Sequence, residues 1–229
     1  MLNKNKFFFN SADDVSIPYY EYTPKKDIKS VVILIYEIFG VTKHIHNFAQ
    51  MLAGKGYLVQ IPDIFSRIEK DVNLQYDKLG FERGLYLKKK LGWDFPIMDI
   101  VSLAALVKQK FKVSSLGFCY GGSIAWRASQ KSFLFDKAVC YYGSSIPDFL
   151  DKKINNPVLA HFGKLDKGIP EEKIKSIKDF SKKQNFELQI FEYENSDHGF
   201  NCEDRKSYNK PSSVLALKRT LNFIEREDD

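Results

Sequence analysis

The segment KVSSLGFCYGGSIAW, residues 112–126, decides the fold. It opens as an apolar run of strand character, closes with a helical pattern, and carries Cys119 where the two meet. Glycines flank the cysteine at positions 117, 121 and 122. Such spacing is typical of a nucleophile elbow, a strained turn that lifts one side chain away from the sheet and needs small neighbours. A thiol there also faces a helix N-terminus, which favours the thiolate.

Five more runs rich in apolar and β-branched residues surround this segment, separated by stretches of helical periodicity. They are VVILIY from Val31, YLVQI from Tyr57, KAVCYYG from Lys137, PVLAHFG from Pro157 and ELQIFEY from Glu187. The expected helices span residues 44–55, 83–91, 94–110, 171–184 and 212–227, besides the helix after the elbow. This alternation predicts an α/β fold with a mostly parallel central sheet and helices on both faces. No repeat or linker divides residues 1–229, so we expect a single domain.

The composition argues against several classes of protein. With 44% hydrophobic residues, the chain can bury a large core without disulfides. The lysines behind its net charge of +6 are spread in short groups, so we expect no nucleic-acid partner. The three cysteines lack the spacing of a zinc site, and we expect them to be reduced, with no metal bound. The first residues lack the pattern of a signal peptide and no apolar run could span a membrane, so we expect a cytoplasmic protein without a membrane partner.

A nucleophile on an elbow needs a base and a residue that orients the base. In this fold the acid and then the histidine follow the nucleophile, at the carboxyl ends of later strands. Asp166 follows the run from Pro157, and His198 follows the run from Glu187. The other histidines open a helix or lie inside a strand. We therefore predict that Cys119, Asp166 and His198 meet at one edge of the sheet.

Each of these residues also has a purely structural interpretation. Cys119 fits a buried cysteine at a tight strand–helix contact, and Asp166 fits a cap for the helix near Pro170. His198 fits a hydrogen-bonded turn residue. Asp197 is a rival acid, although an adjacent residue rarely directs its carboxylate at the same imidazole.

The segment EIFG, residues 37–40, leaves the run from Val31 at the same edge of the sheet. The backbone N–H groups of Ile38 and Tyr120 are candidates for an oxyanion hole. Glu37 is then placed to pair with the Cys119 thiol, although a surface or capping carboxylate also fits its position.

Taken together, YEIFGV, GFCYGG, LDKGIP and DHGFNC resemble the dienelactone hydrolases, also called carboxymethylenebutenolidases. The match runs in order from Glu37 to the closing ALKRTLNFI. The resemblance implies an α/β-hydrolase fold, a small ester or lactone as substrate, a monomer, and no metal or organic cofactor. It implies a triad of Cys119, Asp166 and His198, an oxyanion hole from the backbones of Ile38 and Tyr120, and a share for Glu37 in deprotonating the thiol.

One departure concerns the groups that bind the acid part of the substrate. By resemblance, members that hydrolyse dienelactone hold its carboxylate with two arginines, one of them four residues after the histidine. This chain has Cys202 at that place, and Arg205 three residues further on. Arg83 lies in the segment where the other arginine is expected. We take these three as candidate substrate-binding residues; the departure bears on the identity of the substrate more than on hydrolysis.

These observations predict a cysteine-dependent hydrolase that cleaves a lactone or an activated ester through a thioester on Cys119. Two other interpretations stay open. One is a broader carboxylesterase or thioesterase of the same fold, which a substrate panel would separate. The other is a non-catalytic binding protein with a redox-sensitive Cys119, for which alkylation would change ligand binding while no ester is hydrolysed.

Overall fold

A computed structural model describes residues 3–227. The strands are β1 (Asn3–Asn10), β2 (Ser16–Thr23), β3 (Ser30–Ile35), β4 (Tyr57–Pro62), β5 (Val113–Phe118), β6 (Lys137–Tyr141), β7 (Val158–Gly163) and β8 (Leu188–Tyr193). The helices are α1 (Lys43–Gly54), α2 (Lys78–Leu91), α3 (Asp94–Lys108), α4 (Tyr120–Lys131), α5 (Glu171–Gln184) and α6 (Lys210–Glu225). Two 3-10 turns, η1 (Ile64–Arg67) and η2 (Ile146–Phe149), lie in the connections.

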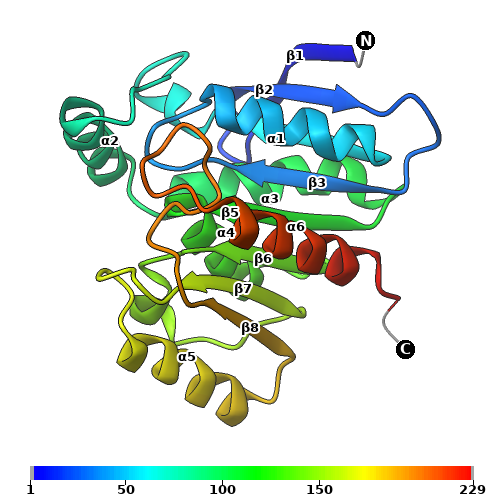
Figure 1. Cartoon of the computed structure of the whole chain (residues 1–229). Helices are drawn as coiled ribbons and strands as arrows, with labels where there is room; N and C mark the ends of the chain where they lie inside the picture. Colours follow the sequence, from blue (N-terminus) through cyan, green and yellow to red (C-terminus); the bar gives the residue numbers. More distant parts are fainter. Residues whose placement is uncertain (1–2, 228–229) are drawn as a thin grey trace.

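All these strands join one sheet in the order β1-β2-β4-β3-β5-β6-β7-β8 (Figure 1). Each neighbouring pair from β4 to β8 is parallel, and β1 and β2 pair antiparallel at one edge. Because β3, β5, β6, β7 and β8 run parallel, their carboxyl ends lie along one edge of the sheet. The strand order changes direction between β3 and β5, which is where sites form in open α/β sheets. The predicted mostly parallel α/β sheet is confirmed.

Helices cover both faces of this sheet. Figure 1 shows α1 and α6 in front of the strands and α3 and α4 behind them. Helix α5 packs on α4, where the rings of Trp126 and Phe180 lie 6.3 Å apart. Because both faces are covered, β3 through β7 are buried along their whole length, which explains why they read as continuous apolar runs.

The antiparallel edge was not predicted from the sequence. β1 contains three consecutive phenylalanines, and β2 contains Pro18, a residue that argues against a central strand. In the structure Phe9 is buried, whereas Phe7 and Phe8 are 41% and 66% exposed. β1 is the edge strand, and one of its sides lacks a partner strand. Pro18 lies in β2 just before Tyr19–Tyr22, the residues that pair with β4, so the register with β4 begins after the proline.

Helix α2 begins five residues before the predicted start at residue 83. The side chain of Asp77 accepts the Gly80 N–H at 2.8 Å and caps the helix. Two glycines inside the helix obscure this start in the sequence. They are needed because a Cβ at Gly80 or Gly84 would strike the backbone of Gln75 or Ile38. Helix α2 therefore packs directly on the Ile38 segment.

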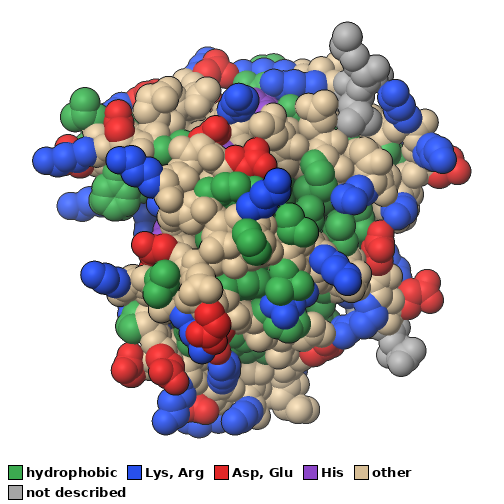
Figure 2. Space-filling view, in the orientation of Figure 1, with side chains coloured by type: hydrophobic (Ala, Val, Ile, Leu, Met, Phe, Trp, Pro, Cys, Tyr) green, Lys and Arg blue, Asp and Glu red, His purple; other side chains and the backbone are tan. Residues whose placement is uncertain are grey.

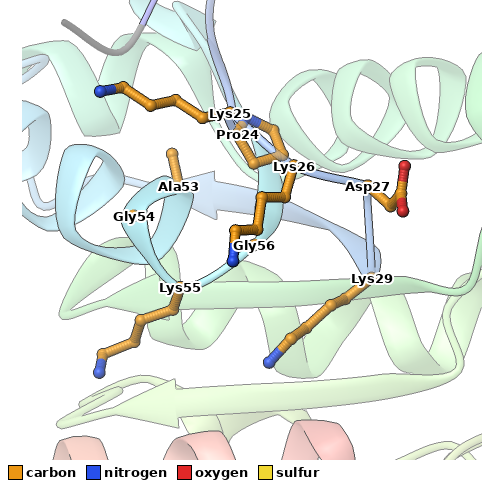
Figure 3. A pocket seen from close by; sticks show the side chains of 9 residues that line it. All are labelled: Pro24, Lys25, Lys26, Asp27, Lys29, Ala53, Gly54, Lys55 and Gly56. Atoms are coloured by element: carbon orange, nitrogen blue, oxygen red, sulfur yellow. The ribbon is translucent and has the colours of Figure 1, made fainter.

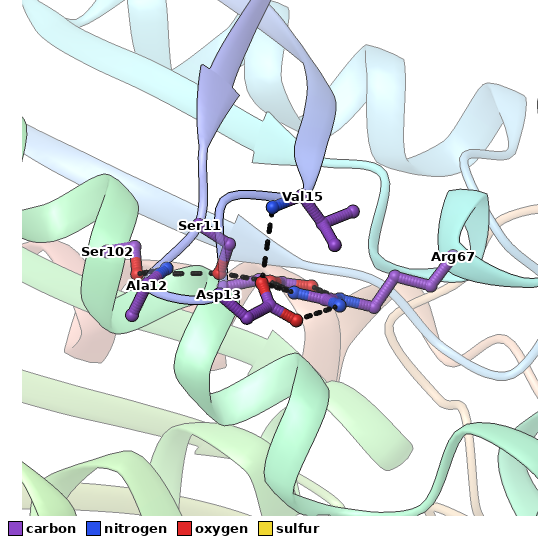
Figure 4. A network of polar contacts seen from close by, with 7 residues as sticks. Ser11, Ala12, Asp13, Val15, Arg67 and Ser102 are labelled. Carbon is purple, nitrogen blue, oxygen red and sulfur yellow. Dashed lines mark hydrogen bonds and ion pairs between the residues drawn. The ribbon is translucent and has the colours of Figure 1, made fainter.

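A buried ion pair fixes the first turn of the chain to the helical layer (Figure 4). Asp99 on α3 is fully buried and receives two bonds from Arg67, at 2.6 and 2.8 Å. The same guanidinium binds Asp13 at 2.8 and 2.9 Å. Ser11 donates to Asp99 at 2.7 Å. Both charges of the buried pair are thus satisfied only while the β1–β2 turn, η1 and α3 stay together.

Replacing this arginine should be costly. We expect Arg67→Met to lower the free energy of unfolding by about 3–5 kcal/mol, since it leaves the Asp99 carboxylate buried without its counter-ion. Arg83→Met is the matched control, because the Arg83–Glu69 pair is on the surface and contributes at most about 1 kcal/mol. Urea titration of both variants measures the difference, and equal losses would mean that the Asp99 site rearranges.

The surface carries charges of both signs. Figure 2 shows basic and acidic side chains interspersed over one face, with apolar side chains gathered between α1 and α6. Val214 and Leu215 of α6 are exposed. Among residues 3–227, no helix has the length and apolar character needed to cross a bilayer.

Candidate active site

Cys119 stands on a strained turn between β5 and α4. Its φ is 53° and its ψ is −110°, a left-handed conformation that side chains other than glycine rarely adopt. A Cβ at position 121 would strike the carbonyl of Ile35, so only glycine lets α4 approach the end of β3 this closely. The predicted elbow is confirmed, and it leaves the thiol partly exposed.

Asp166 and His198 meet after β7 and β8. His198 Nδ1 lies 2.7 Å from Asp166 Oδ2, and the other Asp166 oxygen accepts the Gly168 N–H at 2.8 Å. Asp166 therefore orients the imidazole and also stabilises its own turn. The rival Asp197 accepts the backbone N–H of His198 instead of binding the ring.

The imidazole lies between this carboxylate and the thiol. Burial alone lowers the pKa of His198, but the charge of the Cys119 thiolate, with the hydrogen bonds and charge of Asp166, raises it to about 10. His198 is therefore protonated at neutral pH when it faces the thiolate. Its side chain is 23% exposed, so the ring is partly accessible to water.

Glu37 does not lie on the surface, which rules out the surface carboxylate considered from the sequence. It is 1% exposed and accepts a bond from Arg205 Nη1 at 3.0 Å. The guanidinium of Arg205 packs against Gly199, next to the histidine, where φ is +79° and a Cβ would collide with it. It also lies over the rings of Phe39 and Tyr76.

Cys202 lies near this ion pair and is fully buried. Burial, and next the charge of Glu37, raise the pKa of the Cys202 thiol to about 12, so it stays neutral. Arg83 has a different location, because it binds Glu69 and lies over the Tyr86 ring on the exposed side of α2. Of the two candidate arginines, only Arg205 contacts the Glu37 segment.

Two backbone N–H groups were predicted to form the oxyanion hole. Tyr120 is the first residue of α4, and N–H groups in a first helical turn have no partner within the helix. Ile38 follows Glu37 beyond β3, the strand that pairs with β5. The two segments meet through Gly121, so both donors belong to the same edge as the thiol, and their joint role stays a prediction.

The site thus has an open layer and a buried layer. Cys119, His198 and Arg205 are partly exposed, with 20% of the Arg205 side chain accessible. Glu37 and Asp166 lie behind them, nearly inaccessible to water. A thiol and two groups that can carry positive charge are therefore accessible to a ligand, while the two carboxylates are covered by them. Within the described residues, no three His, Cys, Asp or Glu side chains gather as they do in a metal site.

Sequence reasoning missed one residue of this edge, Tyr142. It follows β6 directly, and its ring centroid lies 5.0 Å from that of His198. No motif marks it, because an apolar strand end with two tyrosines reads as ordinary core. The signal that identifies it, a φ of 38°, exists only in the folded chain.

A separate hollow of about 750 Å³ lies at the opposite edge of the sheet (Figure 3). It is bounded by the segments that enter β3 and β4 and by the end of α1. Its charged lining consists of Lys25, Lys26, Asp27, Lys29 and Lys55. It contains no nucleophile with a paired base, so the candidate active site is the edge that carries Cys119.

Comparison with known proteins identifies the family of this chain. The model of the dienelactone hydrolase family matches residues 17–227. A Synechocystis protein named "Putative carboxymethylenebutenolidase" is 29% identical over 212 residues, 86% of each chain. The "Carboxymethylenebutenolidase" of Pseudomonas putida is 27% identical over 210 residues, 88% of each chain.

Solved structures agree on the fold. A Klebsiella pneumoniae crystal structure named "Putative Dienelactone Hydrolase" superposes with a TM-score of 0.86 and 24% identity, covering 99% of this chain and 100% of the other. That identity supports the α/β-hydrolase fold alone, whereas the family model spans nearly all of the described residues. The chain belongs to the dienelactone hydrolase family of ester-hydrolysing enzymes.

Proposed function

We propose that this protein hydrolyses a lactone or an activated carboxylic ester through a thioester on Cys119. The observation that carries the proposal is a partly exposed thiol on a strained elbow, facing an imidazole that Asp166 holds at 2.7 Å. A nucleophile, a base within reach of it and a group that orients the base are the elements of covalent acyl transfer.

In the first step the Cys119 thiolate attacks the ester carbonyl carbon and forms a carbon–sulfur bond. The negative charge that develops on the carbonyl oxygen is stabilised by the N–H groups of Ile38 and Tyr120. The carbon–oxygen bond then breaks, and the departing oxygen takes the proton of the His198 imidazolium. A thioester and a neutral imidazole remain.

In the second step His198 acts as the base. Once the sulfur is acylated, it no longer carries the negative charge that raised the pKa of His198, so the pKa falls. The imidazole can then accept a proton from water, whose oxygen attacks the thioester carbonyl. The carbon–sulfur bond breaks, the acid is released, and the thiolate–imidazolium pair is restored.

Glu37 shares in deprotonating the thiol in this scheme. Its Oε1 is bound to Arg205, whereas its Oε2 has no hydrogen-bond partner in the protein. Whenever the thiol becomes protonated, this oxygen is a second acceptor besides His198.

The nucleophile restricts the substrates. A thiolate leaves a tetrahedral intermediate more readily than an alkoxide, so a substrate with a poor leaving group returns to starting material. Enol lactones and aryl esters avoid this, because their leaving groups are stabilised anions. We therefore expect little or no peptidase activity.

The initial rates of dienelactone and p-nitrophenyl acetate hydrolysis test the proposal. Turnover of either compound by the wild-type protein supports it, and the ratio of the two rates separates a lactonase from a broader esterase. If neither compound nor a wider ester panel is hydrolysed, the proposed function is wrong, and a ligand-binding role becomes the better account.

Arg205 supplies the cation that can hold an anionic substituent of the substrate. We expect Arg205→Gln to lower the ratio of kcat/KM for dienelactone to kcat/KM for p-nitrophenyl acetate by at least about tenfold, since hydrogen bonds to charged groups contribute about 1.5–3 kcal/mol. Arg83→Gln is the matched control, because Arg83 is bound to Glu69 on the surface. A drop in the ratio for Arg83→Gln alone would assign the carboxylate to α2 instead.

A further inference from the structure

Tyr142 combines backbone strain with complete burial. Its φ of 38° lies in the left-handed region that bulky side chains avoid. Its N–H donates to the His161 carbonyl at 2.8 Å, and the carbonyl of Tyr141 accepts the Cys119 N–H at 2.9 Å. The strained residue thus directly follows a residue bonded to the elbow, and its ring packs against that of His198. Strain of this kind is concentrated at functional sites, where the surrounding structure imposes it.

The hydroxyl of Tyr142 is a buried donor without an acceptor. It is fully buried, and no protein group accepts its hydrogen bond. Glu37 Oε2 is the complementary case, a buried acceptor without a donor. Native proteins rarely leave such groups unsatisfied, and each exception calls for an explanation.

We propose that Tyr142 is a positioning residue whose hydroxyl donates a hydrogen bond to Glu37 Oε2 when that side chain turns, holding the carboxylate charged beside Cys119. The inference rests on the proposed function, in which Glu37 shares in deprotonating the thiol. Among the charged neighbours, Glu37 has the largest effect on the phenol. Burial first, and then this charge, raise the pKa of Tyr142 well above its usual value, so the phenol keeps the proton that it donates.

One other unsatisfied atom lies near the same carboxylate, Nε2 of His44. Burial lowers the pKa of His44, so at neutral pH its ring has a single N–H to donate. His44 packs edge-on against Phe118, whereas the ring of Tyr142 packs against that of His198. The observations therefore favour Tyr142. The titratable and charged groups around Glu37 are His44 on α1, Tyr76 before α2, Cys119 on the elbow, Tyr142 after β6, and Cys202 and Arg205 after β8.

The test is the pH dependence of Cys119 alkylation by iodoacetamide, followed by mass spectrometry of the peptide that contains it. This readout needs no substrate, so it does not depend on whether an ester is hydrolysed. A hydrogen bond to the charged form of a carboxylate lowers its pKa, and Tyr142→Phe removes this bond from Glu37. The acid limb of the profile, where alkylation slows as the pH falls, should therefore move up by about one pH unit. In a Glu37→Gln background the same substitution should cause no further shift, because the two residues act as one unit.

Tyr141→Phe is the matched control. Tyr141 is the preceding residue and is equally buried, but its hydroxyl bonds Thr220 at 2.7 Å, so removing it should leave the profile in place. An unchanged profile for Tyr142→Phe would overturn the inference, as would an equal shift in the Glu37→Gln background. A shift for His44→Asn in place of Tyr142→Phe would assign the donor to His44 instead. A wild type that hydrolyses no ester but shows the predicted shifts would overturn the proposed function and leave this inference standing.

Discussion

Cys119→Ala is expected to lower kcat for phenyl acetate hydrolysis on the order of 10⁴-fold, because it removes the atom that forms the covalent intermediate. The residual rate would come from the oxyanion hole and from binding alone. The fold should persist, since the substitution removes only the sulfur atom. The glycines that allow the close backbone contacts of the elbow are unchanged.

Cys140→Ala controls for the loss of any thiol. Cys140 is fully buried in β6, and burial raises the pKa of its thiol far above the usual value, so it stays neutral and out of reach of substrate. This variant should keep its activity. Full activity in Cys119→Ala would show that another group attacks the ester.

Asp166→Asn is expected to lower kcat on the order of 10³- to 10⁴-fold, because an amide can present the wrong atom to His198 Nδ1 and stabilises no imidazolium. The pH profile should change with it. In the wild type, kcat/KM for phenyl acetate should fall only as the pH passes about 10, where His198 loses the proton that the leaving oxygen takes. Without the Asp166 charge the pKa of His198 is lower, so this limb should move to lower pH.

Initial rates between pH 6 and pH 11 measure both effects. His198→Ala serves as the reference, since it removes the group whose deprotonation causes the fall in kcat/KM at high pH. A limb at the same pH in wild type and Asp166→Asn would mean that His198 is not the group that titrates.

The parallel sheet and its elbow could be predicted because both have local signals. Buried parallel strands read as continuous apolar runs, and the glycines around Cys119 follow from close backbone contacts. The triad could be predicted because the fold fixes the chain order of its members and the sheet edge at which they lie, and its catalytic role stays a prediction. The placement of Asp166 beside His198 agrees with that expectation.

Other features depend on contacts between residues that are distant in the sequence. Arg205 and Glu37 are 168 positions apart, and no spacing rule links them. The ion pair between Arg67 and the buried Asp99 could not be predicted either, because in the sequence both residues resemble ordinary surface charges. The start of α2 was missed because its glycines, required by packing against other segments, resemble helix breakers.

The most direct test of the account is to look for the acyl group itself. The protein is mixed with phenyl acetate, quenched in acid during the first turnovers, and digested for mass spectrometry. We expect one acetyl group on the peptide that contains Cys119, removed by neutral hydroxylamine as a thioester is, and absent from Cys119→Ala. Turnover with the acetyl group on a different residue, or with no acetyl group on any peptide, would contradict the thioester mechanism.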